Sequence, residues 1–147
     1  MSKTESADLI LKLYDLRREE TMRKARTWFF GFNPTSVQDF IDTLFGENSG
    51  YYRMVVSYWD MAASLVNHGA IDEEMFLDSN SEVWIIFAKV QPYLDGVRKV
   101  LDNPTYLHNL EKLIMKQPEC VQKCQSRRES MKRWMAARAE MMAKSAS

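Results

Sequence analysis

The segment from Tyr51 to His68, YYRMVVSYWDMAASLVNH, constrains the fold more than any other part of the sequence. If it is helical, its polar residues are spaced four, three, four and three apart and form one narrow line along the helix. These residues are Arg53, Ser57, Asp60, Ser64 and Asn67. A surface helix has a single apolar face, so a helix that is apolar on nearly every side must be surrounded by others. The segment therefore predicts the buried central helix of an all-α protein.

Length and composition predict one globular domain over residues 1–147. A chain of 147 residues can bury roughly two thirds of the surface that its unfolded form exposes. Hydrophobic residues make up 46% of the chain and charged residues 27%, which is typical of a folded protein. The 20 basic residues balance 20 acidic ones, so no global charge attracts nucleic acid or an anionic membrane.

The first residues and the cysteines bear on the cellular compartment. The start, MSKTESADLI, lacks the basic residues and apolar run of a secretory signal. The longest apolar run, residues 83–88, is far shorter than the about 20 residues of a membrane span. Cys120 and Cys124 are four residues apart on a predicted helix, which is a poor frame for a disulfide. We therefore expect a cytoplasmic protein without a membrane span.

Two helices are predicted before the central one. The apolar spacing from residue 6 to residue 30 predicts one long amphipathic helix, which Gly31 ends. Thr35 and Gln38 have the spacing of a capping box, which predicts a short helix over residues 36–45.

The end of the central helix and the next two starts are also marked by local signals. Gly69 follows His68 where a left-handed residue commonly closes a helix. Asp72 predicts the cap of a short acidic helix over residues 73–77. Ser79 with Glu82 forms a second capping box, ahead of the apolar run VWIIFAKV.

Prolines divide the rest of the chain. Pro92 lies inside an apolar helical pattern and predicts a kink or a short break near residues 89–91. Asn103 and Pro104 predict the start of a helix that ends near Lys116. No glycine or proline follows Pro118, which predicts a long final helix. The predicted fold is thus an all-α bundle of five to seven helices, with long first and last helices.

The final helix is the most basic part of the chain. Residues 118–147 hold seven basic and three acidic side chains, a net charge of +4 that leaves −4 on residues 1–117. A basic helix with aromatic and methionine anchors can bind a protein groove, a membrane surface or nucleic acid. Two interpretations stay open: the helix docks its apolar stripe on its own domain, or it offers the stripe to an oligomer or partner protein. The candidate interface residues are Arg127, Met131, Trp134, Met135, Arg138 and Met142.

The polar line of the central helix is the other candidate site. Arg53, Asp60, Asn67 and His68 can line a pocket for a small molecule, and an Asp near a His is a common acid–base arrangement. A structural ion pair explains Arg53 and Asp60 equally well. Phosphate-loop, dinucleotide, nucleophile-elbow and zinc-protease motifs do not occur in the sequence, so we predict no catalytic residue and no cofactor.

Other chemistries find little support. Neutral overall charge and the lack of a recognition motif argue against nucleic acid. Cys120 and Cys124 supply two of the four ligands of a structural zinc site, and His68 and His108 lie in other segments. Residues 72–82 are acidic but lack the spacing of a calcium loop. Their charge suggests instead a contact with the basic helix of another copy.

One segment, SYWDMAASLVNHGAIDEEMF, resembles a bacterial family of small helical domains of unknown function, the 4760 type. Family members have an aromatic and acidic helix followed by a conserved-looking turn of the form hGiiDeell. The residues that carry the resemblance are Tyr58, Trp59, Asp60, Ala62, Ala63, His68, Gly69, Ile71, Asp72, Glu73 and Glu74. The resemblance implies an all-helical fold and supplies no activity. We expect a non-catalytic protein that acts by protein association, as a homo-oligomer or an accessory subunit; the alternative is a small-molecule binding module or enzyme.

Overall fold

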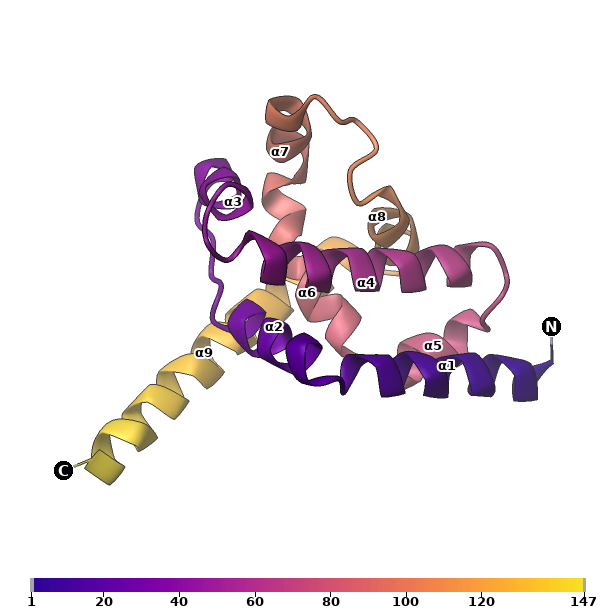
Figure 1. The fold of residues 1–147 in the computed structure, drawn as a ribbon, viewed down its shortest axis with the longest axis horizontal. Helices are drawn as coiled ribbons and strands as arrows, with labels where there is room; N and C mark the ends of the chain where they lie inside the picture. Colours follow the sequence, from indigo (N-terminus) through magenta and orange to yellow (C-terminus); the bar gives the residue numbers. More distant parts are fainter. Residues whose placement is uncertain (1, 147) are drawn as a thin grey trace.

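A computed structural model describes residues 2–146 and shows an all-helical protein (Figure 1). Within this range there are nine α-helices, one 3-10 helix and no strand. The helices are α1 (Lys3–Arg17), α2 (Glu20–Phe30), α3 (Val37–Leu44), α4 (Ser49–Asn67), α5 (Glu73–Ser79), α6 (Glu82–Val90), η1 (Gln91–Tyr93), α7 (Leu94–Leu101), α8 (His108–Met115) and α9 (Cys120–Ala146). The all-α prediction is confirmed, but the number of helices exceeds the predicted five to seven because two predicted helices are each divided.

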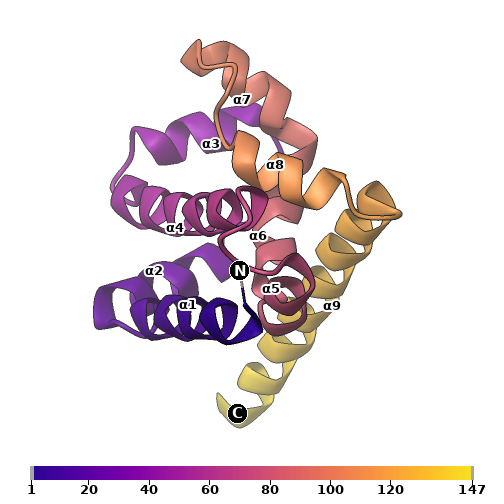
Figure 2. The same cartoon turned by 90° about the vertical axis from the view of Figure 1, so that its right-hand side faces the viewer.

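The predicted central helix is α4, and other helices enclose most of it. It lies between α1 and α2 on one side and α3 and α8 on the other (Figures 1 and 2). Tyr52, Val55 and Trp59 are fully buried. The prediction that other helices surround α4 on nearly every side is too strong, however, because Met61 is 46% exposed. The exposed strip is therefore wider than the polar line.

The predicted helix over residues 6–30 is wrong, because the chain breaks into α1 and α2 between Arg17 and Glu20. The Glu19 carboxylate accepts hydrogen bonds from the backbone N–H groups of Thr21 and Met22, both at 2.9 Å. It thereby caps α2, and these two donors lower the pKa of Glu19. Glutamate is not a favoured N-cap residue, so the sequence carries no strong signal for this break.

Both predicted capping boxes are wrong in detail. At α3 the capping residue is Ser36, whose hydroxyl accepts from Asp39 N at 3.2 Å. The predicted box at Ser79 fails because that hydroxyl donates to Met75 O at 2.7 Å and closes α5 instead. Glu82 binds Arg26 of α2 through two hydrogen bonds, of 2.7 and 2.9 Å. A local bond has therefore taken Ser79, and a tertiary contact has taken Glu82.

The ends of α4 and α5 follow the sequence more closely. Gly69 closes α4 with φ +81°, and the N–H of Ala70 donates to Leu65 O at 2.9 Å. This left-handed turn is the one that a glycine after a helix predicts. Asp72 caps α5 by accepting from Met75 N at 2.9 Å. This bond lowers the pKa of Asp72.

The predicted proline kink is confirmed. Pro92 lies in η1, which joins α6 to α7. A proline has no N–H, so the carbonyl of residue i−4, Ala88, loses its helical partner. Arg128 of α9 replaces that partner with a hydrogen bond of 2.7 Å from Nη1. The kink therefore creates the acceptor that fixes α9 to α6.

The start of α8 differs from the prediction. The helix begins at His108 and not at Asn103. The Asn103 side chain instead accepts from Thr105 N and Oγ1, and Leu107 has φ 56°. Residues 102–107 therefore form a structured loop, because Asn103 satisfies local turn donors before a helix can begin.

A buried lysine joins α6 to the end of α2. Lys89 is 5% exposed, and its ammonium donates to the carbonyls of Phe29, Phe30 and Phe32 at 2.8, 3.0 and 2.8 Å. These carbonyls lie at and just after the C-terminal end of α2, where helical acceptors lack partners. Burial lowers the pKa of Lys89 to about 8.

Candidate interaction site

The last helix, α9, divides into a docked half, residues 120–131, and a free half, residues 132–146. Its first half lies against α6. There Cys124 is fully buried, and the Arg128 guanidinium donates a hydrogen bond to Ala88 O. Every residue from 136 to 146 is exposed. Both views show this end of α9 extending beyond the other helices (Figures 1 and 2). At about 1.5 Å per residue, the exposed end is roughly 16 Å long.

The face by which α9 docks continues into the free half. Cys124, Met131, Met135 and Met142 are spaced seven, four and seven apart, so they lie on one sector of the helix. Met131 and Met135 are half-buried, whereas Met142 is 62% exposed. A single apolar stripe therefore begins against α6 and ends in solvent.

A second pair of large apolar residues lies beside this stripe. Trp134 is 55% exposed and Met141, seven residues later, is 64% exposed. Arg138 lies between them along the helix, with its guanidinium 5.7 Å from the centre of the Trp134 ring. The free half thus carries an aromatic and methionine surface. Met141 was missed in the sequence-based interface, although its spacing from Trp134 would have identified it.

An apolar hollow adjoins this surface where α9 leaves the body of the protein. It has a volume of about 520 Å³ between α2, α6 and α9. Phe30, Ile85, Met131, Trp134, Ser130 and Arg127 line it. The candidate interface residues from Arg127 to Trp134 therefore border one hollow, and Arg138 and Met142 lie further along the free half.

The protein exposes more surface than a compact monomer of its mass. Its accessible surface is 8818 Å². A compact monomer of 17.2 kDa is expected to expose about 7,800 Å². The surplus of about 1,000 Å² is similar to the roughly 800 Å² that each partner buries in a stable protein interface.

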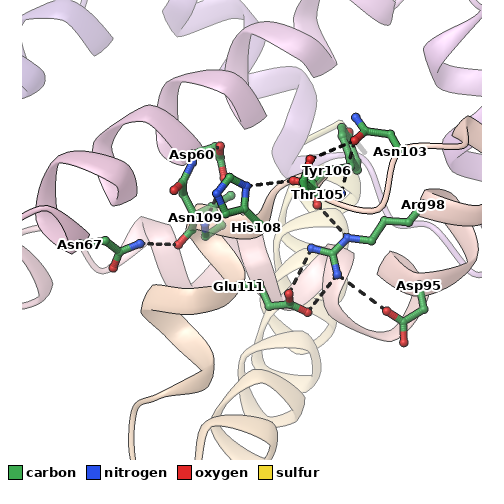
Figure 3. A network of polar contacts seen from close by, with 11 residues as sticks. Asp60, Asn67, Asp95, Arg98, Asn103, Thr105, Tyr106, His108, Asn109 and Glu111 are labelled. Carbon is green, nitrogen blue, oxygen red and sulfur yellow. Dashed lines mark hydrogen bonds and ion pairs between the residues drawn. The ribbon is translucent and has the colours of Figure 1, made fainter.

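Two residues of the polar line of α4, Asp60 and Asn67, hold α8 in place. Asp60 Oδ1 accepts from Leu110 N at 3.0 Å, and Oδ2 accepts from Asn109 Nδ2 at 3.0 Å. Asn67 Nδ2 donates to Asn109 O at 3.0 Å (Figure 3). Because Leu107 offers no side-chain cap, Asp60 supplies the carboxylate that the start of α8 lacks. The line is therefore a helix–helix contact from Asp60 to Asn67, whereas Arg53 and Ser57 are exposed.

The residues of the proposed pocket are divided between two places. Arg53 and Asp60 border an open groove of about 910 Å³ along the exposed strip of α4. Asn67 faces α8, and His68 bonds through Nδ1 to Ser64 O at 2.8 Å. The structure thus brings Arg53 and Asp60 to one groove and leaves Asn67 and His68 outside its lining.

The groove has an apolar floor and a fixed wall. Met54 and Met61 of α4 lie in its floor, and residues 103 and 105–108 form one side. Arg98 holds that side with a bond of 2.9 Å from Nε to Tyr106 O (Figure 3). Its guanidinium also donates to both carboxylate oxygens of Glu111, at 3.1 and 3.3 Å. The wall is therefore anchored to α7 and α8.

The other candidate ligands are dispersed or already paired. Asp72 pairs with Lys3 and Glu73 with Lys116, so much of the acidic segment is engaged within the chain. Cys120 and Cys124 are free thiols. Among residues 2–146, no three histidine, cysteine or acidic side chains gather where they could hold a metal ion. Across the same range, no helix combines the length and hydrophobicity needed to cross a membrane.

These features define an all-helical domain to which a long, partly exposed helix is attached. The chain belongs to the family described as Domain of unknown function (DUF4760), whose model matches residues 3–117. The matched region contains α1 to α8 and ends before α9. Comparisons with curated proteins and with solved structures give no match.

Proposed function

We propose that this protein acts without catalysis, through protein association, and that the free half of α9 is its contact surface. The observation that supports this most is the apolar stripe that begins in the core at Cys124 and ends in solvent at Met142. A methionine-rich surface adapts to a partner, and a tryptophan beside an arginine is typical of interface hot spots. The protein is then a homo-oligomer or an accessory subunit, in the cytoplasm of a bacterial cell.

The polarity of the free half further supports a protein partner. Lys132, Arg133 and Arg138 surround the Trp134 and Met142 anchors, as in an amphipathic helix that enters an apolar groove with an acidic rim. The alternative function, a small-molecule pocket at Arg53 and Asp60, is less favoured. Binding sites enclose most of their ligand, whereas the groove over α4 is open and both oxygens of Asp60 bind α8.

The test compares the full chain with a double variant, Trp134→Asp with Met142→Asp. Light scattering after size exclusion, and quantitative crosslinking in the cells that make the protein, both measure association. We expect the double variant to lose the self-contacts or partner contacts of the wild type while its helix content is unchanged. Leu11→Asp is the matched control, because Leu11 is 64% exposed on α1. A wild type that stays monomeric and uncrosslinked, or a double variant that keeps its partners, would overturn the proposal.

A further inference from the structure

The groove over α4 is a second apolar surface without a partner in this chain. Met54 and Met61 in its floor are 37% and 46% exposed. Leu44 lies at its edge, and the next residue, Phe45, is 80% exposed. Monomers rarely leave several large apolar side chains together in solvent without a function. The groove over α4 is thus such a surface, in addition to the one on α9.

The two surfaces have the same length. The exposed strip of α4 extends from Arg53 to Met61, eight residues further along the helix, or about 12 Å. The anchors of α9 extend from Trp134 to Met142, which is also eight residues and about 12 Å. The methionines on both sides have flexible side chains that can fill each other's gaps.

The segments around the two surfaces have opposite net charge. Residues 132–146 hold Lys132, Arg133, Arg138 and Lys144 against Glu140, a net charge of +3. Arg53 and Asp60 are the charged residues among those that line the groove, and they balance. The adjoining segments add Asp42, Glu47 and Asp102, so residues 42–61 and 102–108 together have a net charge of −3. Charge complementarity of this kind guides two surfaces together and disfavours other pairings.

Pairing of α9 with the α9 of another copy is disfavoured by the same charges. Two antiparallel free halves would bring a net +3 against a net +3. Arg138, at the middle of the anchor segment, would face its own counterpart. Like charges held together across an interface are destabilising. The groove over α4, with its acidic neighbouring segments, is therefore the better acceptor for this helix.

We propose that the groove over α4 receives the free half of α9 from a second copy of this chain. The proposal rests on the proposed function above and names its partner. The groove wall at residues 103–108 is already held by Arg98, so binding orders little additional chain. In this contact the exposed apolar residues of the free half of α9 and the apolar floor of the groove over α4 are buried against each other.

The positions of the two surfaces determine the type of assembly. The exposed end of α9 lies on the opposite side of α4 from α3, α7 and the 102–107 loop in both views (Figures 1 and 2). The contact therefore joins two different surfaces, head to tail. Such contacts form chains or rings and do not stop at a two-fold dimer. We expect the mean mass to rise steadily with concentration from that of the 17.2 kDa chain.

The test uses two full-length variants that damage different surfaces. Met61→Arg places a bulky cation in the groove, and Trp134→Asp removes an anchor and adds a negative charge to α9. Each change should weaken self-association at least about tenfold. An equimolar mixture should recover one dimer, because one variant keeps its groove and the other keeps its α9. Leu11→Arg is the control, and circular dichroism checks that all variants fold.

Each result separates this proposal from the proposed function. Dimers in the mixture, but in neither variant alone, would support the groove as acceptor. Wild-type association in Met61→Arg would overturn the groove proposal while leaving α9 as the contact surface. Wild-type association in Trp134→Asp would overturn both. A mixture that stays monomeric, or a wild type that is monomeric up to about 1 mM, would overturn the groove proposal alone.

Discussion

Among the described residues, α9 is the longest helix and α4 is the second longest. Their large apolar residues have opposite environments. Trp59 of α4 is fully buried, whereas Trp134 of α9 is 55% exposed. In α4 the large side chains face five neighbouring helices. In α9 they continue beyond the contact with α6 and α8 that covers its first half. A tryptophan side chain therefore serves the core in α4 and an exposed surface in α9.

Replacing the same residue type in both helices gives the largest expected contrast. Trp59→Ala removes a fully buried ring and should lower the free energy of unfolding by about 3–5 kcal/mol. Trp134→Ala, in the exposed part of α9, should change it by no more than about 0.5 kcal/mol. Urea unfolding followed by circular dichroism measures both. Equal losses would mean that α9 belongs to the cooperative core.

A second prediction concerns Lys89, which lies where α9, α6 and the end of α2 meet. Lys89→Met leaves three carbonyls without their donor and should cost about 2–4 kcal/mol at neutral pH. Lys132→Met, on the exposed side of α9, is the matched control. If both variants unfold at the same urea concentration, the ammonium does not cap α2.

The same lysine predicts a pH dependence. The pKa of Lys89 is about 8 in the folded protein, below its ordinary value of 10.5. Between these values the unfolded chain binds more protons, so stability rises with pH. The contribution is complete above pH 10.5 and is lost as the pH falls toward 8. The difference in unfolding free energy between wild type and Lys89→Met should therefore grow from pH 8 to 10; a constant difference would contradict the lowered pKa.

The docked half of α9 should depend on Arg128. Arg128→Met removes the donor that serves Ala88 O at the proline kink, and the expected loss is about 1–3 kcal/mol. Arg133→Met changes an exposed arginine of the same helix and is the control. Hydrogen exchange should show faster exchange across residues 120–131 in Arg128→Met alone. Unchanged exchange there would mean that Cys124 suffices to dock α9.

The polar line of α4 allows a smaller test. Asp60→Ala leaves the backbone N–H of Leu110 without its acceptor and should lower the free energy of unfolding by about 1–2 kcal/mol. The exposed Asp78 provides the control Asp78→Ala. Faster amide exchange in α8 would accompany the loss. An effect equal to that of the control would remove Asp60 as the cap of α8.

The smallest effect is expected from shortening α9. Ending the chain after Met135 removes only exposed residues from the described range and should change the unfolding free energy by less than about 0.5 kcal/mol. The helical signal should fall in proportion to the residues removed. A large loss of stability in a monomer would show that the free half contributes to the fold and is not reserved for a partner.

The sequence by itself determined the features that depend on neighbouring residues. It placed α4 within two residues of its true ends, its closure at Gly69, the Asp72 cap and the kink at Pro92. Each of these depends on groups within about one helical turn. The same reasoning identified α9 as basic and rich in methionine, and it placed Arg53 and Asp60 on one side of α4.

Only the tertiary structure decided how groups distant in the chain are paired. Asp60 caps a helix 50 residues away, Arg128 completes a kink 40 residues earlier, and Glu82 binds Arg26 instead of capping its own helix. Sequence spacing cannot reveal these partners, because a side chain that satisfies a distant backbone group leaves no periodic pattern. The length of α9 that remains uncovered was also fixed in three dimensions. It depends on where α6 and α2 end relative to the stripe, and local helix signals in α9 are the same on its docked and free halves.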